Sequence, residues 1–558
     1  MSKKTYQYHE QHTPTALLTP RLSSISPVCL DILYQRGYDT SEKMTSFLFP
    51  DFHACLENFA FQDMDRAVSV LQEAVEQGTA ITVYHDYDVD GCASCAVMLE
   101  CLRAIGAVTH YYSNDRVIDG YGICENGIDQ ILAQYPDTKL ILTVDNGISG
   151  THPISYAKSK GLSVIVTDHH EPTGALPVDA SAVIDPKRLD ECYPFHDFCG
   201  TAIAFKVMLA LYTAMGKNTQ AVMHTIDLVA LATVADVVPL HGENRVLVQA
   251  GLASIRSGTR PAFAVLNHEV KNVTAHHTLS FLYAPMINAL SRMGETTDIA
   301  VEFFLETDLN RAGETAKHLT QINESRKKST TEQMKIAMKQ IDPHALGSSI
   351  ILYDPQFTEG MIGLIAGRLK KEYNRPCIVF ADAGDHILKA SGRSVDEFDI
   401  KNALDQLSNR LLGYGGHKKA AGFSIQKETL FDFSEAFTKL SDTALQHFDF
   451  AEKRTIDYIL DASDLNVDLV EELHILEPYG EGFQRPIFGL RANYNDVQFM
   501  GTEKQHVKYL VRDANLSIIE WNGAQQERLR KKPRHKFVGF PQVNEWRANV
   551  SVQFVVDD

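Results

Sequence analysis

The sequence predicts a multidomain α/β protein with a parallel sheet in its first half, a second α/β unit and a β-rich C-terminal domain. Three observations carry this prediction. Strand-like and helix-like segments alternate between residues 80 and 190, a polar stretch of helix formers covers Arg311–Gln340, and short strand candidates fill the last part of the chain. At 558 residues the chain is also too long for one compact core.

The first α/β region is predicted from its regular alternation. Each apolar, β-branched run ends in a polar or glycine-rich loop and is followed by a helix-like stretch, as expected of a parallel sheet. Ligands bind at the carboxyl ends of the strands in such sheets. The predicted strands are Ala80–Tyr84, Ala107–Tyr112, Leu140–Val144, Ser163–Thr167 and Ala182–Ile184, and the predicted helices include Ala93–Ile105, Gly127–Gln134 and Pro153–Lys160.

The rest of the chain divides by composition. Residues 199–257 are predicted to be mainly helical, Arg311–Gln340 to form a long connecting helix, and the strand candidates after residue 450 to form a small β-barrel of the OB type. The expected division is an N-terminal extension at 1–50, a first α/β domain at 51–310, a connecting helix at 311–345, a second α/β domain at 346–450 and an OB-type domain at 451–558.

Composition indicates a cytoplasmic protein with no membrane segment. No apolar stretch approaches the roughly 20 residues that span a bilayer. The nine cysteines are odd in number and scattered, which fits a reducing compartment. A formal net charge of −18 argues against a protein that coats nucleic acid non-specifically. It does not exclude a nuclease, because acidic side chains around metal ions are neutralised locally.

Acidic and histidine side chains follow three of the predicted strands. The first strand ends in HDYDVDG (His85–Gly91), the third in VDNG (Val144–Gly147) and the fourth in TDHH (Thr167–His170). Asp236 lies in the apolar segment ATVADVVPL, where a lone carboxylate would be costly. Because parallel strands end at one edge of the sheet, these groups are expected to converge there.

Converging carboxylates repel one another unless cations lie between them. Oxygen ligands with one or two imidazoles suit Mn²⁺ well and Mg²⁺ acceptably, and this composition is typical of a two-metal phosphoryl-transfer site. Each motif alone has a plainer interpretation: DxDxDG as a calcium-type loop, DNG as a turn, HH as a surface pair, and Asp236 as a helix-terminal residue. Their conjunction at successive strand ends favours the metal site.

Five motifs in this order, DYDVDG, RVIDGYG (Arg116–Gly122), VDNG, TDHH and ADVVPL, resemble the motifs of the DHH phosphoesterase superfamily. The resemblance implies two metal ions, Mn²⁺ or Mg²⁺, with water as the nucleophile and His170 beside the attacked phosphate. Arg116 would contact substrate phosphate. One ion would be held by Asp86, Asp88 and Asp145, and the other by Asp90, Asp145, His169 and Asp236, with Asp145 bridging the two.

The second α/β unit resembles the DHH-associated domain of the same superfamily, through GMIGLIAGR (Gly360–Arg368), SGRS (Ser391–Ser394) and GGH (Gly415–His417). In GGH, two glycines let the backbone approach a phosphate and the imidazole donates to an oxygen. By analogy with the superfamily, a terminal phosphate would be anchored by Ser391 and Arg393, since a guanidinium matches phosphate geometry. The resemblance adds Asn288, Arg292, Arg368 and Lys508 as nucleic-acid contacts and His417 as a catalytic group beside Asp145 and His170.

The C-terminal region indicates which members of the superfamily this chain resembles most. Small relatives generally end after the second unit, whereas this chain continues with EPYGEG (Glu477–Gly482), a β-rich tail and a dense basic cluster around Arg528–Lys536. These features resemble the OB domain of RecJ-type exonucleases, and OB folds grip single strands with a basic groove and stacking aromatics. For the cluster alone, a solvated loop is an equally good interpretation.

The chain departs from the superfamily pattern at three places. Phe357-Thr358 replaces a Trp-His pair, Met286 and its neighbours in PMINALSR lack one Arg and one Gly of PRxNAxGR, and Phe483 stands where an Asn is usual. None of these positions supplies a metal ligand in the superfamily. The departures bear on substrate grip and rate and leave the reaction class unaffected.

The function implied is 5′→3′ exonucleolytic hydrolysis of single-stranded DNA to 5′-mononucleotides, in DNA repair and recombination. The implied enzyme acts as a monomer, with a single-strand-binding protein and a helicase as further partners. Two alternatives stay open: a DHH phosphodiesterase of small nucleotides or short RNA, and a non-catalytic replication accessory protein. A chain-length series of substrates separates the first from the exonuclease, and absence of any manganese-dependent cleavage would favour the second.

Overall fold

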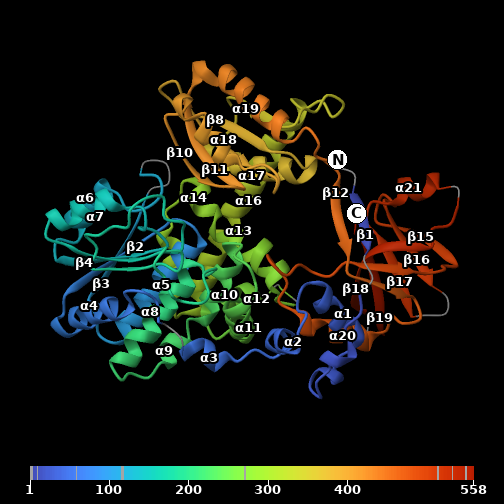
Figure 1. Cartoon of the computed structure of the whole chain (residues 1–558), viewed down its shortest axis with the longest axis horizontal. Helices are drawn as coiled ribbons and strands as arrows, with labels where there is room; N and C mark the ends of the chain where they lie inside the picture. Colours follow the sequence, from blue (N-terminus) through green and yellow to red (C-terminus); the bar gives the residue numbers. More distant parts are fainter. Residues whose placement is uncertain are drawn as a thin grey trace.

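The computed structural model describes residues 4–8, 11–57, 60–114, 119–268, 270, 272–511, 515–530, 532–546 and 549–557. Figure 1 shows two lobes, joined through green helices at the centre, and a β-rich module in red and dark blue beside them. None of the helices in this described part of the chain combines the length and the apolar character that a bilayer crossing requires.

The first lobe is built on a five-stranded, wholly parallel sheet in the order β3-β2-β4-β5-β6. The register pairs His85 with Val144, Val144 with Thr167, and Thr167 with Ile184, so four strands end level with one another. This confirms the predicted parallel α/β sheet. The strands are β2 (Ala80–His85), β3 (Thr109–Ser113), β4 (Thr138–Val144), β5 (Ser163–Thr167) and β6 (Ala182–Ile184).

Helices cover both faces of this sheet. The apolar residues of α4 (Met64–Gln77), α5 (Val89–Ala104) and α8 (Gly200–Ala214) share one core with the strands, and those of α6 (Glu125–Gln134) and α7 (Thr151–Ser159) form another. Beyond α8 the lobe is helical, as predicted, with α9 (Gln220–Met223), α10 (Ile226–Ala235), α11 (Gly242–Ser257) and α12 (Pro261–Asn267). A π-helix (Ala275–Tyr283) and the helices α13 (Ala284–Ile287), α14 (Ala289–Met293) and α15 (Asp298–Leu305) complete it.

The predicted connecting helix is α16 (Leu309–Lys339). Asp308 caps its N-terminus, because its carboxylate accepts hydrogen bonds from the backbone N–H groups of Asn310 and Arg311, both at 2.9 Å. The helix packs against the first lobe through Ala312, Leu319 and Ile322 and against the second through Ala337. It therefore fixes the spacing of the two lobes.

The second lobe carries a five-stranded sheet in the order β10-β11-β9-β8-β7, in which β7 and β8 are parallel and the other pairs antiparallel. The predicted second α/β unit is thus confirmed. Its strands are β7 (Ile350–Tyr353), β8 (Cys377–Asp382), β9 (Ile387–Arg393), β10 (Gly413–His417) and β11 (Ala420–Gln426), and its helices are α17 (Glu359–Tyr373), α18 (Ile400–Gln406) and α19 (Leu430–Ala444).

The C-terminal module contains a seven-stranded sheet in the order β13-β14-β18-β19-β17-β16-β15, which agrees with the predicted β-rich domain. No pairing of β13 with β15, which would close a barrel, occurs among the strand pairs of the described residues. The strands are β13 (Tyr458–Asp461), β14 (Phe488–Arg491), β15 (Asp496–Met500), β16 (His506–Val511), β17 (Leu516–Glu520), β18 (Lys536–Trp546) and β19 (Asn549–Val556), with α20 (Val467–Glu472) and α21 (Ala524–Leu529).

The N-terminal segment folds onto this C-terminal module. Strand β1 (Lys4–Tyr8) pairs in parallel with β12 (Glu452–Ile456). The helices α1 (Pro27–Gln35) and α2 (Ser41–Leu48) bury their apolar side chains in the same core as the C-terminal strands, whereas α3 (Phe52–Glu57) contributes to the core of the first lobe. The two ends of the chain therefore form one module.

A buried arginine joins this module to the first lobe. The guanidinium of Arg245, in α11, donates to the backbone carbonyls of Leu476, Glu477 and Pro478 at 2.7 to 3.1 Å and lies 3.6 Å over the Phe47 ring. Burial lowers the pKa of Arg245 to about 10. Because the side chain is 2% exposed, these carbonyls have a charged donor in place of water.

Candidate metal centre

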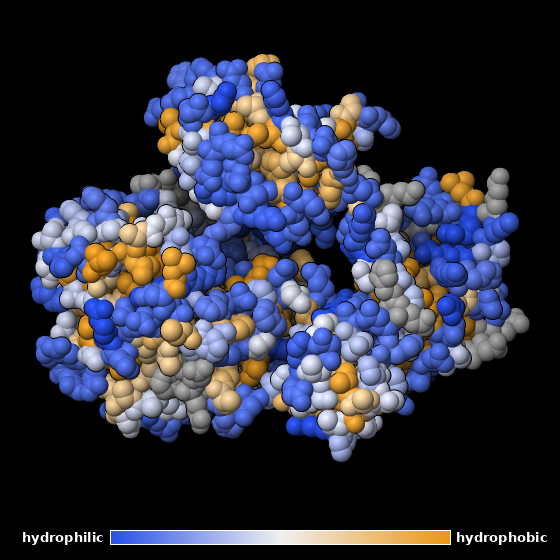
Figure 2. All heavy atoms as spheres, in the orientation of Figure 1, coloured by the Kyte–Doolittle hydropathy of each residue, from blue (hydrophilic) through white to orange (hydrophobic). Residues whose placement is uncertain are grey.

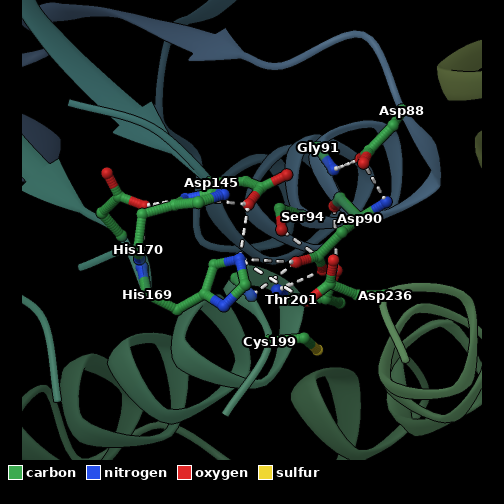
Figure 3. A network of polar contacts seen from close by, with 12 residues as sticks. Asp88, Asp90, Gly91, Ser94, Asp145, His169, His170, Cys199, Thr201 and Asp236 are labelled. Carbon is green, nitrogen blue, oxygen red and sulfur yellow. Dashed lines mark hydrogen bonds and ion pairs between the residues drawn. The ribbon is translucent and has the colours of Figure 1, made fainter. Parts of the chain in front are cut away.

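Acidic and imidazole side chains gather where the strands of the first lobe end. Asp86 follows β2, Asp145 follows β4, and His169 lies two residues beyond β5, while Asp236 ends α10. Figure 3 shows Asp90, Asp145 and Asp236 directed toward the His169 ring. Three sets have ligand atoms within 4.8 Å of one another: Asp86, Asp88 and Asp145; Asp90, His169 and Asp236; and Asp145, His169 and His170.

The first turn of α5 places two of these carboxylates. Asp88 is the N-cap, and its Oδ1 accepts hydrogen bonds from the backbone N–H groups of Asp90 (2.9 Å) and Gly91 (3.1 Å). A Cβ at Gly91 would lie 2.3 Å from the carbonyl oxygen of Asp86. Glycine is therefore needed for the helix to begin this close to the end of β2.

The N-terminus of α8 holds Asp90. The carboxylate of Asp90 accepts hydrogen bonds from the backbone N–H groups of Gly200 (2.6 Å) and Thr201 (2.8 Å) and from the Thr201 hydroxyl (2.6 Å). The positive end of a helix dipole stabilises such a carboxylate. A Cβ at Gly200 would lie 2.8 Å from the Cβ of Asp145, so this contact also requires glycine.

Backbone strain occurs at two residues of the site. Asp145 has a φ of 61°, and Val237, directly after Asp236, has a φ of 59°. Side chains rarely adopt this left-handed region, least of all β-branched ones. Strained backbone of this kind concentrates at functional sites.

His170 is positioned by its own loop. Its Nδ1 lies 2.7 Å from Asp168 Oδ1, and Asp168 also accepts hydrogen bonds from the backbone N–H groups of His169 (2.7 Å) and Ile148 (2.9 Å). Burial disfavours the imidazolium, but the hydrogen bond to Asp168 and the charge of Asp168 outweigh it and raise the pKa of His170 to about 9. The hydroxyl of Tyr121 lies 2.8 Å from the same ring.

Without bound cations, it would be unfavourable for all of the clustered carboxylates to be ionised in this buried site. Burial, followed by repulsion from Asp90, raises the pKa values of Asp145 and Asp236 well above their usual range. Burial lowers the pKa of His169 to about 4, so its ring is neutral and suited to a metal. The side chains are those that Mn²⁺ and Mg²⁺ accept, five carboxylates and at least one neutral imidazole.

Two buried atoms fit a bound ion directly. Asp145 Oδ1 and His169 Nε2 have no hydrogen-bond partner in the described part of the chain, yet they lie 3.0 Å apart. Neighbouring ligands of an octahedral ion with bonds of about 2.1 Å are roughly 3.0 Å apart. The residues therefore fit a pair of divalent cations, with Asp145 shared between the set of Asp86 and Asp88 and a set that contains His169.

The candidate residues of the second lobe lie in its strands β9 and β10. His417 ends β10, and burial, followed by the positive charges of His170 and Lys187, lowers its pKa. In β9, Arg393 donates to Ser391 Oγ at 3.0 Å. Gly415 and Gly416 lie in β10, and a Cβ at Gly416 would lie 2.4 Å from the carbonyl oxygen of Ala420.

The remaining predicted residues have different surroundings. Asn288 Oδ1 accepts a hydrogen bond from the backbone N–H of Val89 at 3.3 Å and so contacts the start of α5, beside the metal ligands. Arg292 donates to the carbonyl oxygen of Gly360, across the two lobes. Lys508 lies in β16 of the C-terminal module. Arg116 lies outside the described residues.

A cavity of about 2180 Å³ separates the second lobe from the C-terminal module, and Figure 2 shows it as an opening through the molecule. It is lined from three sides, by α17 of the second lobe, by the N-terminal segment and by the C-terminal module. The lining residues carry both signs of charge, and two of the cations are ion-paired, Arg36 with Asp457 and Arg454 with Asp557. The charged lining residues include Arg36, Arg368, Lys371, Arg454 and Arg485, and Glu372, Asp396, Glu452, Asp457 and Asp557.

Several residues at the site were not predicted to take part in it. Asp168 lies in the TDHH motif and Tyr121 in the RVIDGYG motif, but neither was expected to have a role of its own. The hydrogen bonds of Gly200 and Thr201 to Asp90 join residues 110 and 111 positions apart, and no local pattern marks such a contact. Lys187 follows β6, whose carboxyl end also lies at the site.

Comparison with known proteins identifies the relatives of this chain. Residues 80–233 match the family described as "DHH family, N-terminal domain", residues 345–444 the "DHHA1 domain" and residues 456–558 the "RecJ OB domain". The chain is 31% identical to the single-stranded-DNA-specific exonuclease RecJ of Bacillus subtilis, over 96% of this chain and 68% of that protein. It is 32% identical to the RecJ of Salmonella typhimurium, over 89% of this chain and 90% of that protein.

Solved structures agree with these relatives. The structure of RecJ from Thermus thermophilus in complex with Mn²⁺ superimposes with a TM-score of 0.84 and 26% identity, covering 100% of this chain and 79% of that one. The same protein in complex with Mg²⁺ gives a TM-score of 0.79 and 25% identity, covering 100% of this chain and 78% of the other.

Proposed function

We propose a function for this chain from one premise: the chain belongs to the RecJ family, whose named relatives are single-stranded-DNA-specific exonucleases. Its activity is accordingly the metal-dependent removal of nucleotides from single-stranded DNA. One observation supports this most strongly. Asp145 converges with Asp86 and Asp88 in one set and with His169 and His170 in another, and Asp90 and Asp236 converge on the same His169, so that two divalent cations, Mn²⁺ or Mg²⁺, fit side by side at the strand ends.

The ligand assignment follows the geometry of the sets. We assign Asp86, Asp88 and Asp145 to one ion, and Asp90, His169 and Asp236 to the other. Asp145 is added to the second ion because its Oδ1 lies 3.0 Å from His169 Nε2 and because the superfamily resemblance implies a shared ligand. Bound ions of this kind lower the pKa of water and neutralise charge on phosphoryl oxygens. The chain's part is to hold the carboxylates against their repulsion, through the α5 and α8 N-termini, and to keep His169 neutral.

Two histidines on opposite lobes act on the substrate. His170, with a pKa of about 9, is cationic at neutral pH and can donate a hydrogen bond to a phosphate oxygen. His417 donates from the second lobe, where glycines at 415 and 416 let the backbone approach a phosphate. Such donors stabilise charge that develops in the transition state.

The direction of digestion follows from where a terminal phosphate is held. Ser391 and Arg393 lie together in β9, near the start of α17, and are the proposed anchors of a 5′-phosphate. The products would be 5′-mononucleotides and the polarity 5′→3′. A single strand would pass Arg368, which lines the cavity, on its way to the cleft between the two lobes, and a cleft too narrow for a duplex would select single strands without reading sequence.

Partners and compartment follow from the same features. Both lobes of the site come from one chain, which supports action as a monomer. Because only unpaired strands are substrates, a helicase and a single-strand-binding protein would supply and hold the substrate. The nine cysteines are all free thiols, seven of them buried, which supports a reducing, cytoplasmic setting.

The decisive experiment digests a 5′-labelled single strand, a 3′-labelled single strand and a duplex, each with Mn²⁺ and with chelator. We expect mononucleotides from the 5′ label first, resistance of the duplex and no reaction with chelator. Asp145→Ala should abolish turnover but leave DNA binding largely intact, since it removes the shared ligand and not the grip. Near-normal turnover of that variant, or preference for very short RNA over long DNA, would contradict the proposal.

A further inference from the structure

Tyr121 lies in a turn between two glycines, close to the end of β3. Gly120 and Gly122 have φ values of 76° and 83°, a region that side chains rarely adopt. The buried side chain of Asn114 donates to the carbonyl oxygens of both glycines. In turn, the hydroxyl of Tyr84, in β2, donates to Asn114. The sheet therefore holds this turn from behind and fixes where the Tyr121 side chain begins.

The hydroxyl of Tyr121 joins two parts of the metal centre. It donates a hydrogen bond to the backbone carbonyl oxygen of Asp145 at 3.1 Å. The same oxygen lies 2.8 Å from His170 Nδ1 and 3.5 Å from His170 Nε2, so it rests against the part of the ring that contains both nitrogens. The tyrosine and histidine rings meet edge-on, with centroids 5.1 Å apart. One hydroxyl therefore contacts the turn after β4 and the loop after β5.

The surrounding hydrogen bonds determine the direction of each contact. Asp168 accepts hydrogen bonds from backbone N–H groups at 2.7 and 2.9 Å, so its carboxylate is an acceptor. His170 Nδ1, 2.7 Å from Asp168 Oδ1, therefore carries a proton and donates it. Because the hydroxyl proton of Tyr121 is used in the hydrogen bond to Asp145, the Tyr121 oxygen turns its lone pairs toward the His170 ring.

These two contacts together set the orientation of the His170 ring. A ring held only by the hydrogen bond to Asp168 could still rotate about that bond, and the His170 side chain is 31% exposed. The Tyr121 hydroxyl supplies a second point of contact on the same ring. Since Nδ1 is occupied by these neighbours, Nε2 is the nitrogen that remains for a substrate phosphate.

Packing does not explain the presence of a tyrosine at this position. Tyr121 is 50% exposed, so only part of its ring is removed from water, whereas its hydroxyl makes all of the contacts with Asp145 and His170 described above. A polar end on an otherwise half-exposed ring is the feature that the site uses.

We propose that Tyr121 is a positioning residue that acts through His170: its hydroxyl fixes the imidazole ring so that Nε2 is directed to a phosphate oxygen of the substrate. This role rests on the proposed nuclease function and gives the tyrosine of the DGYG motif a part in it. Tyr121 does not touch the reacting atoms, and its loss should affect turnover rather than the binding of metal or strand.

The test uses the full chain and compares Tyr121→Phe, His170→Ala and the double variant in single-turnover digestion of single-stranded DNA with Mn²⁺. We expect Tyr121→Phe to lower the rate about 10-fold, as loss of one hydrogen bond does, with KM and Mn²⁺ affinity unchanged. In the His170→Ala background the same substitution should have no further effect, because its partner is already gone. The control is Tyr156→Phe, which removes a hydroxyl that donates to Asp129 elsewhere in the same lobe and should leave the rate unchanged.

A second measurement needs neither metal nor turnover. In the metal-free chain with labelled histidine side chains, the nuclear magnetic resonance signal of His170 is the one that disappears in His170→Ala. Tyr121→Phe should shift this signal, because it removes the oxygen that lies against the ring. Tyr156→Phe should leave the signal where it is.

Four results would overturn the proposal. An equal loss of rate in the His170→Ala background would show that Tyr121 acts independently of His170. Weakened Mn²⁺ binding would place its effect at Asp145, and a raised KM with an unchanged rate would make Tyr121 a contact of the strand. An unshifted His170 signal would remove the contact itself. Failure of the proposed function looks different, because the unaltered chain would then not cleave single-stranded DNA with Mn²⁺, while the His170 signal would still respond to Tyr121→Phe.

Discussion

The tight contact at Gly200 gives the most specific prediction. In Gly200→Ala the added methyl carbon would lie 2.8 Å from the Cβ of Asp145 and 3.0 Å from its Cα. Ordinary contacts of this kind begin at 3.4 Å, so Asp145 or the start of α8 must move by roughly 0.6 Å. The backbone N–H of residue 200 is kept, and the added carbon would also lie 3.1 Å from Asp90 Oδ2, which accepts its hydrogen bond, so the perturbation is steric and acts on both carboxylates.

Three consequences should be measurable. Overpacking of this kind lowers the free energy of unfolding by about 1–3 kcal/mol. Because Asp145 is the ligand that we assign to both ions, a shift of this size should also lower kcat by about 10- to 100-fold and weaken Mn²⁺ binding. Thermal unfolding, Mn²⁺ titration and single-strand digestion measure the three effects.

A matched glycine provides the control. Gly313 lies inside α16 and has no heavy atom within 4 Å of an added Cβ. Gly313→Ala should therefore be neutral or stabilise the protein by about 0.5–1 kcal/mol, with unchanged activity. Wild-type Mn²⁺ affinity and wild-type turnover in Gly200→Ala would refute the contact as a determinant of the site.

Three further predictions concern other regions. His417→Ala should lower kcat by about 10²–10³-fold with unchanged Mn²⁺ affinity, measured by single-turnover digestion; an unaltered rate would remove His417 from the site. Arg245→Met should leave three buried carbonyls without a donor and lower the free energy of unfolding by at least about 3 kcal/mol. In calorimetry the terminal module should then unfold in a separate transition, and a single transition at the original Tm would contradict this. His224 donates to Glu100, which raises the pKa of His224, so its stabilising effect is present below the unfolded pKa of about 6.5 and is lost as pH rises through the folded value. His224→Gln should accordingly lower Tm more at acidic than at alkaline pH, and an equal loss at both would argue against this ion pair.

The sequence was most informative where local pattern and tertiary structure coincide. Strands buried on both faces produce continuous apolar runs, and Asp86 and Asp145 follow such runs directly while His169 lies two residues beyond one. The predicted sheet is confirmed for this reason. Strand β18 was not foreseen, because Gly539 and Pro541 interrupt the pattern expected of a central strand and its basic start resembles a loop.

Contacts between distant segments left no such signal. Arg245 in the sequence is an ordinary helix-former beside polar residues, and only the packing of the terminal module makes it a buried donor. Gly200 likewise has no neighbour in the chain that marks its contact with Asp145. Positions of this kind depend on how separate elements meet, which neither hydrophobic period nor motif spacing encodes.

The central claim is that a buried cage of carboxylates and imidazoles holds two divalent cations. Calorimetric titration of the full chain with Mn²⁺, paired with electron paramagnetic resonance, tests it directly. We predict two ions per chain with a spin-coupled signal in the unaltered protein, and loss of that coupled pair in Asp145→Ala. A single uncoupled ion, or full stoichiometry in the variant, would contradict the claim.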